Sequence, residues 1–104
     1  MLKCDFCSAP NPKWKHVTPD FTVGVHDGYH FSSHGFWAAC EVCNTFIMRG
    51  EQMALSVRSL DTLLKASPEM TPYCCDLFVE MEELHRKFFA FRRGEPGLIA
   101  EAAA

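Results

Sequence analysis

The fold of this chain is decided by the stretch Trp37-Ala38-Ala39-Cys40-Glu41-Val42-Cys43 together with Cys4-Asp5-Phe6-Cys7 near the start. Each stretch holds two cysteines separated by two residues, a spacing that lets one turn direct both sulfur atoms at the same point. Six cysteines in 104 residues could instead form a disulfide scaffold, but paired spacing is typical of metal knuckles in a reducing compartment. We therefore predict one structural Zn²⁺, with a full ligand shell and no open position, held by Cys4, Cys7, Cys40 and Cys43.

The segment between the two cysteine pairs must leave the metal and return to it. Residues 21–26 read as a strand, Asp27-Gly28 is a strong two-residue turn signal, and residues 29–31 begin a return strand. Beyond Cys40, apolar residues recur at helical intervals, which predicts a helix with Cys40 and Cys43 in its first turn. The positive end of that helix would stabilise the nearby thiolates.

This order of parts resembles the treble-clef class of zinc fingers, in which a knuckle and a hairpin precede a helix that supplies the last two ligands. The resemblance covers residues 4–50, and the zinc-binding domain of the bacterial Clp unfoldase has a similar second knuckle. It implies an α+β fold and no particular activity.

Most of the chain also resembles a group of small proteins found in actinobacteria and their phages. The shared pattern is CDFC followed by Pro10, Pro12 and Trp14, then WAAC followed by Cys43, and finally a helical segment. In that segment Leu84-His85 precedes Phe88-Phe89. This resemblance brings no known activity with it.

The second half of the chain predicts a pair of helices packed on the zinc finger part. The first covers residues 51–66, and its apolar stripe consists of Met53, Val57, Leu60 and Leu64. The second begins near Thr71-Pro72 and runs to Arg93, with a stripe made of Leu77, Met81, Leu84, Phe88 and Phe91. We expect a single domain over residues 1–96, divided into a zinc finger part (1–50) and a helical part (51–93), with a flexible tail over 97–104.

The remaining cysteines and histidines do not form a catalytic motif. Cys74 and Cys75 are adjacent on a helix and point about 100° apart, so we interpret them as small buried hydrophobic residues. His26, His30 and His34 are spaced by four but are split by a turn, which favours ordinary surface histidines. The protein is accordingly predicted not to be an enzyme.

Composition indicates what kind of partner to expect. The formal charge is −3 and the pI is near 5.9, and four thiolates with one Zn²⁺ would lower the charge by two further units. This disfavours nucleic acid and favours a protein partner. No apolar run approaches the roughly 18 residues of a membrane helix, and the first residues lack the apolar stretch of a signal peptide, so we expect no membrane association and a cytoplasmic location. One locally basic, aromatic cluster is a candidate contact, namely Lys13, Trp14, Lys15 and His16.

Two alternatives remain open for that cluster. Trp14 could instead cover a small core, because it follows two prolines. The basic residues could also join Arg92 and Arg93 in a patch that binds nucleic acid, since a local patch can outweigh net charge. The sequence leaves the partner, the biological process, the oligomeric state and any role of His30 and His34 undetermined.

Overall fold

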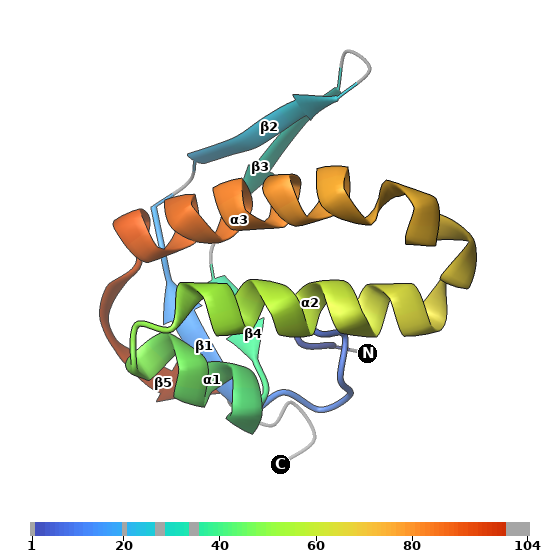
Figure 1. Cartoon of the computed structure of the whole chain (residues 1–104). Helices are drawn as coiled ribbons and strands as arrows, with labels where there is room; N and C mark the ends of the chain where they lie inside the picture. The colour runs from blue at the N-terminus through green and yellow to red at the C-terminus, as the bar shows by residue number, and fades with distance from the viewer. Residues whose placement is uncertain (1, 20, 27–28, 34–35, 100–104) are drawn as a thin grey trace.

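A computed structural model describes residues 2–19, 21–26, 29–33 and 36–99, and these residues form an α+β structure (Figure 1). The strands are β1 (Trp14–Val17), β2 (Phe21–His26), β3 (Tyr29–Ser33), β4 (Phe36–Ala39) and β5 (Arg93–Leu98). The helices are α1 (Glu41–Met48), α2 (Gln52–Ala66), α3 (Cys74–Phe91) and a short 3₁₀ segment, η1 (Pro68–Tyr73). None of the helices in these ranges is long and apolar enough to cross a membrane.

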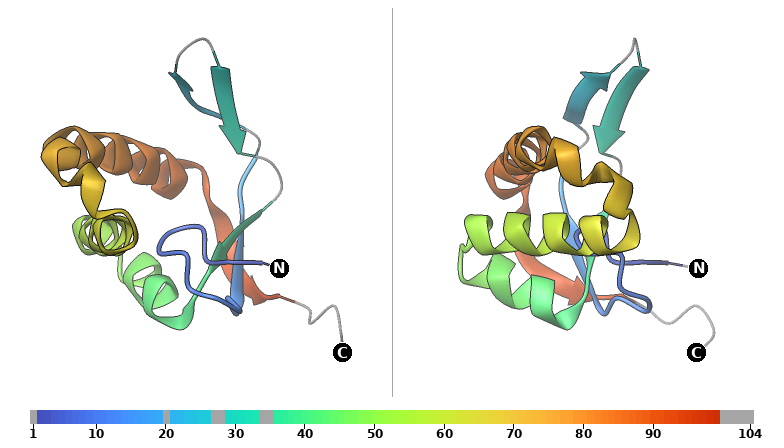
Figure 2. Two further views of the ribbon diagram at one scale, coloured as in Figure 1. Left: turned by 90° about the vertical axis from the view of Figure 1, so that its right-hand side faces the viewer. Right: turned by 45° about the vertical axis from the view of Figure 1, so that its right-hand side comes forward.

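The larger sheet is antiparallel and has three strands, in the order β4-β1-β5. Strand β1 pairs with β4 from Trp14↔Ala39 to Val17↔Phe36, and with β5 through Trp14↔Leu98, Lys15↔Gly97 and Val17↔Arg93. The left panel of Figure 2 shows this sheet on one side and the helices on the other. The sheet therefore joins the N-terminal region to the last described residues of the chain.

The predicted tail is wrong for residues 97–99. Gly97 and Leu98 belong to β5, and the Ile99 backbone N–H donates to the Lys13 carbonyl at 2.8 Å. Helix α3 ends at Phe91, two residues before the predicted end at Arg93, and Gly94 and Pro96 lie within β5. The chain turns back along the second edge of β1 and satisfies its backbone groups there. Residues 100–104 lie outside the described residues.

The predicted hairpin is confirmed as β2 and β3, which form a separate two-stranded sheet. Its turn at residues 27–28 lies outside the described residues. The hairpin projects beyond α3, away from the larger sheet (Figures 1 and 2). The return of the chain to the first cysteine pair thus depends on the pairing of β1 with β4, a pairing that the sequence did not predict.

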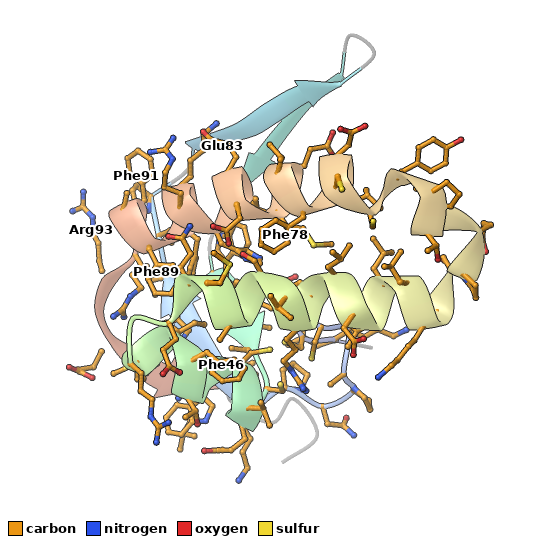
Figure 3. All side chains as sticks on the ribbon, viewed as in Figure 1. Phe46, Phe78, Glu83, Phe89, Phe91 and Arg93 are labelled. Atoms are coloured by element: carbon orange, nitrogen blue, oxygen red, sulfur yellow. The ribbon has the colours of Figure 1, made fainter. Side chains whose placement is uncertain are left out.

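The core is aromatic and centres on Phe88, which is fully buried. Its ring centroid lies 5.0 Å from that of Phe6, 5.1 Å from that of Trp37 and 5.6 Å from that of His16. Figure 3 shows a second aromatic residue of α3, Phe78, between α2 and α3, whereas Phe91 points away from α2. Helix α3 therefore closes a core to which the N-terminal segment and the sheet both contribute.

The apolar stripe predicted for α2 does not face the core. Met53 and Val57 are 59% and 52% exposed, and the buried residues of α2 are Leu55, Ser56 and Ser59. The inward face is displaced by about one residue, or roughly 100°, around the helix axis. This face places Ser56 within hydrogen-bond distance of His85 on α3, a contact that the more apolar face could not make.

A buried polar pair fixes the register of α2 against α3. Ser56 Oγ lies 2.7 Å from His85 Nδ1, and both side chains are almost completely excluded from solvent. Burial lowers the pKa of His85 from 6.5 to about 4, although Glu82 opposes this shift. A serine beside a histidine can act in catalysis, but here neither group is accessible to a substrate, so the pair is structural.

We predict that His85 makes the fold sensitive to acid. Between pH 6.5 and pH 4 the unfolded chain binds a proton at this side chain and the folded chain does not, so the free energy of unfolding falls as the pH falls. The loss specific to His85 should reach about 3 kcal/mol over that interval. Urea unfolding of the wild type and of His85→Gln at pH 7 and pH 4.5, in the same metal state, measures it. The variant should be less stable at pH 7 and should approach the wild type at pH 4.5, and a constant difference between the two would contradict the prediction.

Candidate metal centre

The first cysteine pair lies in a tight turn that two backbone hydrogen bonds close. The Ser8 N–H donates to the Cys4 carbonyl at 2.9 Å, and the Cys4 N–H donates to the Ala9 carbonyl at 2.8 Å. Ser8 adopts a left-handed conformation with φ 65°, which turns the chain away immediately after Cys7. The turn thus presents Cys4 and Cys7 together and leads the backbone away from them.

Asp5 joins this turn to β4. Its backbone N–H donates to the Ala38 carbonyl at 2.8 Å, and its Oδ2 accepts from the Ala38 N–H at 2.7 Å. Since β4 continues directly into Cys40, these two bonds set the distance between the two cysteine pairs.

The second pair lies at the start of α1, as the sequence predicted. Cys40 is the N-cap residue, and its Sγ accepts from the Cys43 N–H at 3.5 Å. The Cys40 N–H in turn donates to Cys4 Sγ at 3.4 Å. Backbone donors and the helix N-terminus therefore both favour negative charge on these sulfur atoms.

The four sulfur atoms of Cys4, Cys7, Cys40 and Cys43 all lie within 4.8 Å of one another. Cys7 Sγ and Cys40 Sγ are 3.6 Å apart. A tetrahedral ion with metal–sulfur bonds of about 2.3 Å requires sulfur atoms about 3.8 Å apart. The cluster that the sequence predicted thus has the dimensions of a site that could hold one metal ion.

Without a cation these four groups compete for negative charge. A hydrogen bond from Cys43 lowers the pKa of Cys4, and the same bond raises the pKa of Cys43. Burial raises the pKa of Cys7. A bound divalent cation would remove this competition, because it favours the thiolate form of every ligand at once.

One residue beside this cluster was not predicted from the sequence. Arg58, on α2, directs Nη2 toward Cys7 Sγ at 3.7 Å. The two residues are 51 positions apart, and no motif connects them, so the sequence held no signal for this contact.

Cys74 and Cys75 lie at the start of α3 and take no part in the sulfur cluster. Cys74 is partly exposed and Cys75 is exposed. The prediction that they are small buried residues is therefore wrong, because α3 is buried at His85 and Phe88, in its C-terminal half, and its first turn lies beyond that core.

The predicted partner contact is divided between two faces of β1, a strand that the sequence did not predict. Lys13 is exposed, and the Lys15 side chain lies over the outer face with its Nζ 5.8 Å from the centroid of the Phe36 ring. His16 is only 1% exposed, and its Nε2 lies 2.8 Å from Asn44 Oδ1. Trp14 packs against the core and donates from Nε1 to Glu41 Oε2 at 3.1 Å. His16 is thus excluded from a surface contact, and Trp14 covers the core as the alternative interpretation held.

No family model, curated protein or solved structure matches this chain. The α+β arrangement and the convergence of four cysteines are consequently the observations from which a function can be inferred. The four cysteines lie together at the start of α1, where β4 ends, and they are the candidate site among the described residues.

We predict that the chain binds one divalent metal ion and that Cys43→Ser abolishes this binding. Titration with Co²⁺ should reach an end point at one ion per chain, with the intense near-ultraviolet absorption of thiolate ligands. The matched control is Cys74→Ser with Cys75→Ser, which should keep the same end point because these residues lie outside the cluster. Loss of metal binding in this control variant would show that the ligands have been assigned wrongly.

Proposed function

We propose that this chain is a small, non-catalytic, zinc-stabilised protein of treble-clef type that binds another protein. The observation that carries the proposal is the convergence of four cysteine sulfur atoms on one point, at the N-terminus of α1. Four thiolates fill a tetrahedral shell and leave no position for a water molecule or a substrate, which supports a structural ion over a catalytic one. The order of knuckle, strands and capped helix supports the treble-clef assignment.

The ligand set favours zinc, although iron also accepts four thiolates. Zinc has no redox chemistry and no preferred geometry of its own, and therefore suits a site whose task is to hold two turns together. The binding free energy of such an ion contributes directly to folding, because the unfolded chain has no preformed site.

We expect purified protein, kept reduced, to contain one zinc ion per chain by elemental analysis. Removal of the ion by a strong chelator should abolish cooperative thermal unfolding, because the two cysteine turns then lose their common attachment. A metal content near zero, or an unchanged unfolding transition after complete chelation, would contradict a structural role. Iron in place of zinc would contradict the choice of metal only.

An exposed apolar surface on α2 supports a protein partner. Met53 and Val57 are one helical turn apart and are each more than half exposed, and Leu60 and Leu64 continue the same stripe with partly buried side chains. Apolar residues that recur along one helix face, and that packing within the chain leaves uncovered, are typical of a surface that another protein covers. We call Met53, Val57, Leu60 and Leu64 the α2 stripe.

The outer face of the sheet supports a second candidate function, which is nucleic-acid binding. Antiparallel pairing places Arg93 opposite Val17 and β5 beside β1, so the two basic segments of the sequence become neighbours. The face also carries the partly exposed Phe36 beneath Lys15, and Figure 3 shows Arg93 directed away from the body of the molecule. Basic and aromatic groups on one open face suit a phosphate backbone and a stacked base.

Two double variants separate these candidates, because each alters one surface and leaves the cysteines unchanged. Met53→Ser with Val57→Ser should reduce recovery of a protein partner from cell extract about tenfold or more, as expected when apolar anchors are removed. Lys13→Glu with Lys15→Glu should leave that recovery unchanged. Both measurements are made with and without nuclease, at matched metal content.

The opposite result for the two double variants would favour nucleic-acid binding. In that case the unmodified chain binds a DNA or RNA fragment at physiological salt, and the affinity falls steeply between about 50 and 200 mM salt. The lysine variant would then lose binding while the α2 variant retains it, and that result would overturn the proposed protein partner.

A further inference from the structure

Arg58 is the one basic side chain of the described residues that is seen to donate to a cysteine of the cluster. It extends from the middle of α2, and its Nη2 lies 3.7 Å from Cys7 Sγ. Its Nε is buried and has no hydrogen-bond partner. A guanidinium that loses part of its hydration in this way requires a compensating negative charge nearby.

No carboxylate among the described residues supplies that charge. The ion pairs seen on α2 and α3 are exposed pairs, Lys65 with Asp61 and Arg86 with Glu83, and neither involves Arg58. The nearest source of negative charge is accordingly the sulfur cluster itself.

The metal-bound cluster would supply the negative charge that the Arg58 guanidinium requires. Four thiolates around a divalent ion carry a net charge of −2, and three of the four cysteines are buried. Backbone N–H groups donate to Cys4 from Cys40 and to Cys40 from Cys43. Cys7 Sγ receives the Arg58 side chain in addition to a backbone donor at Ala9, and Arg58 also interacts with Cys43. Each donor lowers the electron density on its sulfur atom and stabilises the bound state.

We propose that Arg58 is a positioning residue of the metal centre, which compensates the charge of the bound tetrathiolate ion through Cys7 and ties α2 to that centre. The inference rests on the proposed metal centre and adds a residue from the helical part of the chain to it. Occupancy of the site therefore stabilises the contact of α2 with the first cysteine turn, as well as the two turns themselves.

The test compares Arg58→Met and Arg58→Lys with the wild type. Methionine keeps the apolar stem and removes the charge, and lysine keeps the charge and removes the planar donor. Arg86→Met is the matched control, since Arg86 lies on the exposed face of α3 and pairs with Glu83. The Zn²⁺ dissociation constant is measured by competition with a chromophoric chelator, and circular dichroism checks that each variant is folded with metal bound.

We expect Arg58→Met to weaken Zn²⁺ binding by about 10- to 100-fold, which is the usual effect of removing a group that supports a metal ligand. Arg58→Lys should recover part of this loss, and Arg86→Met should stay within about twofold of the wild type. A dissociation constant for Arg58→Met within about twofold of the wild type would overturn the proposal, as would an equal loss in Arg58→Lys and Arg58→Met.

A second readout distinguishes this role from simple packing of α2. In the Co²⁺-loaded protein, the thiolate-to-metal absorption should move to longer wavelength in Arg58→Met, because a thiolate that loses a hydrogen bond gives up electron density more easily. Packing alone would leave this band in place, and an unchanged band would overturn the proposal even if affinity fell. A wild-type chain that binds no metal would overturn the metal centre as well, whereas normal binding with an insensitive Arg58 would overturn this inference alone.

Discussion

The convergence of four sulfur atoms on one point is the constraint on which the rest of the structure depends. It requires the turn at Cys4 and the cap of α1 at Cys40 to lie side by side, although 36 positions separate them. The long intervening segment can meet this requirement only if it returns, and the pairing of β1 with β4 brings it back. Asp5 then joins the turn to β4 through two hydrogen bonds, so that sheet, turn and helix share one frame.

The metal centre and the aromatic core form one continuous unit. Phe6 lies between Cys4 and Cys7 in sequence, and its ring packs on Trp37, His85 and Phe88. A change in the positions of the cysteines would therefore disturb the packing of α3 through the Phe6 ring, and the packing of α2 through Arg58. In a chain of this length the core alone supplies limited stability, which gives a physical reason for a metal ion at this position.

Two surfaces formed by the described residues differ in chemistry, and both bear on the proposed function. The outer face of the sheet is basic with a partly exposed aromatic ring, and the α2 stripe is apolar. A closed four-thiolate shell would offer a substrate nothing to coordinate, and for this reason the function we propose is binding through one of these surfaces. The acidic total charge of the chain favours the apolar surface.

The sequence by itself determined the helix that starts at Cys40, the β2–β3 hairpin and the position of α2, because each depends on spacing between near neighbours. It also identified the four cysteines of the cluster, because each pair has the spacing of a metal knuckle, although the two pairs meet only through the pairing of β1 with β4. Tertiary structure alone decided that β1 pairs with β5, that His16 faces the core, that α2 buries Leu55, Ser56 and Ser59, and that Arg58 reaches Cys7. These outcomes join segments far apart in the chain, and they follow from which face packs most closely. Hydrophobic periodicity shows which residues are apolar, but it does not show the buried bond between Ser56 and His85, or that β5 pairs with the second edge of β1.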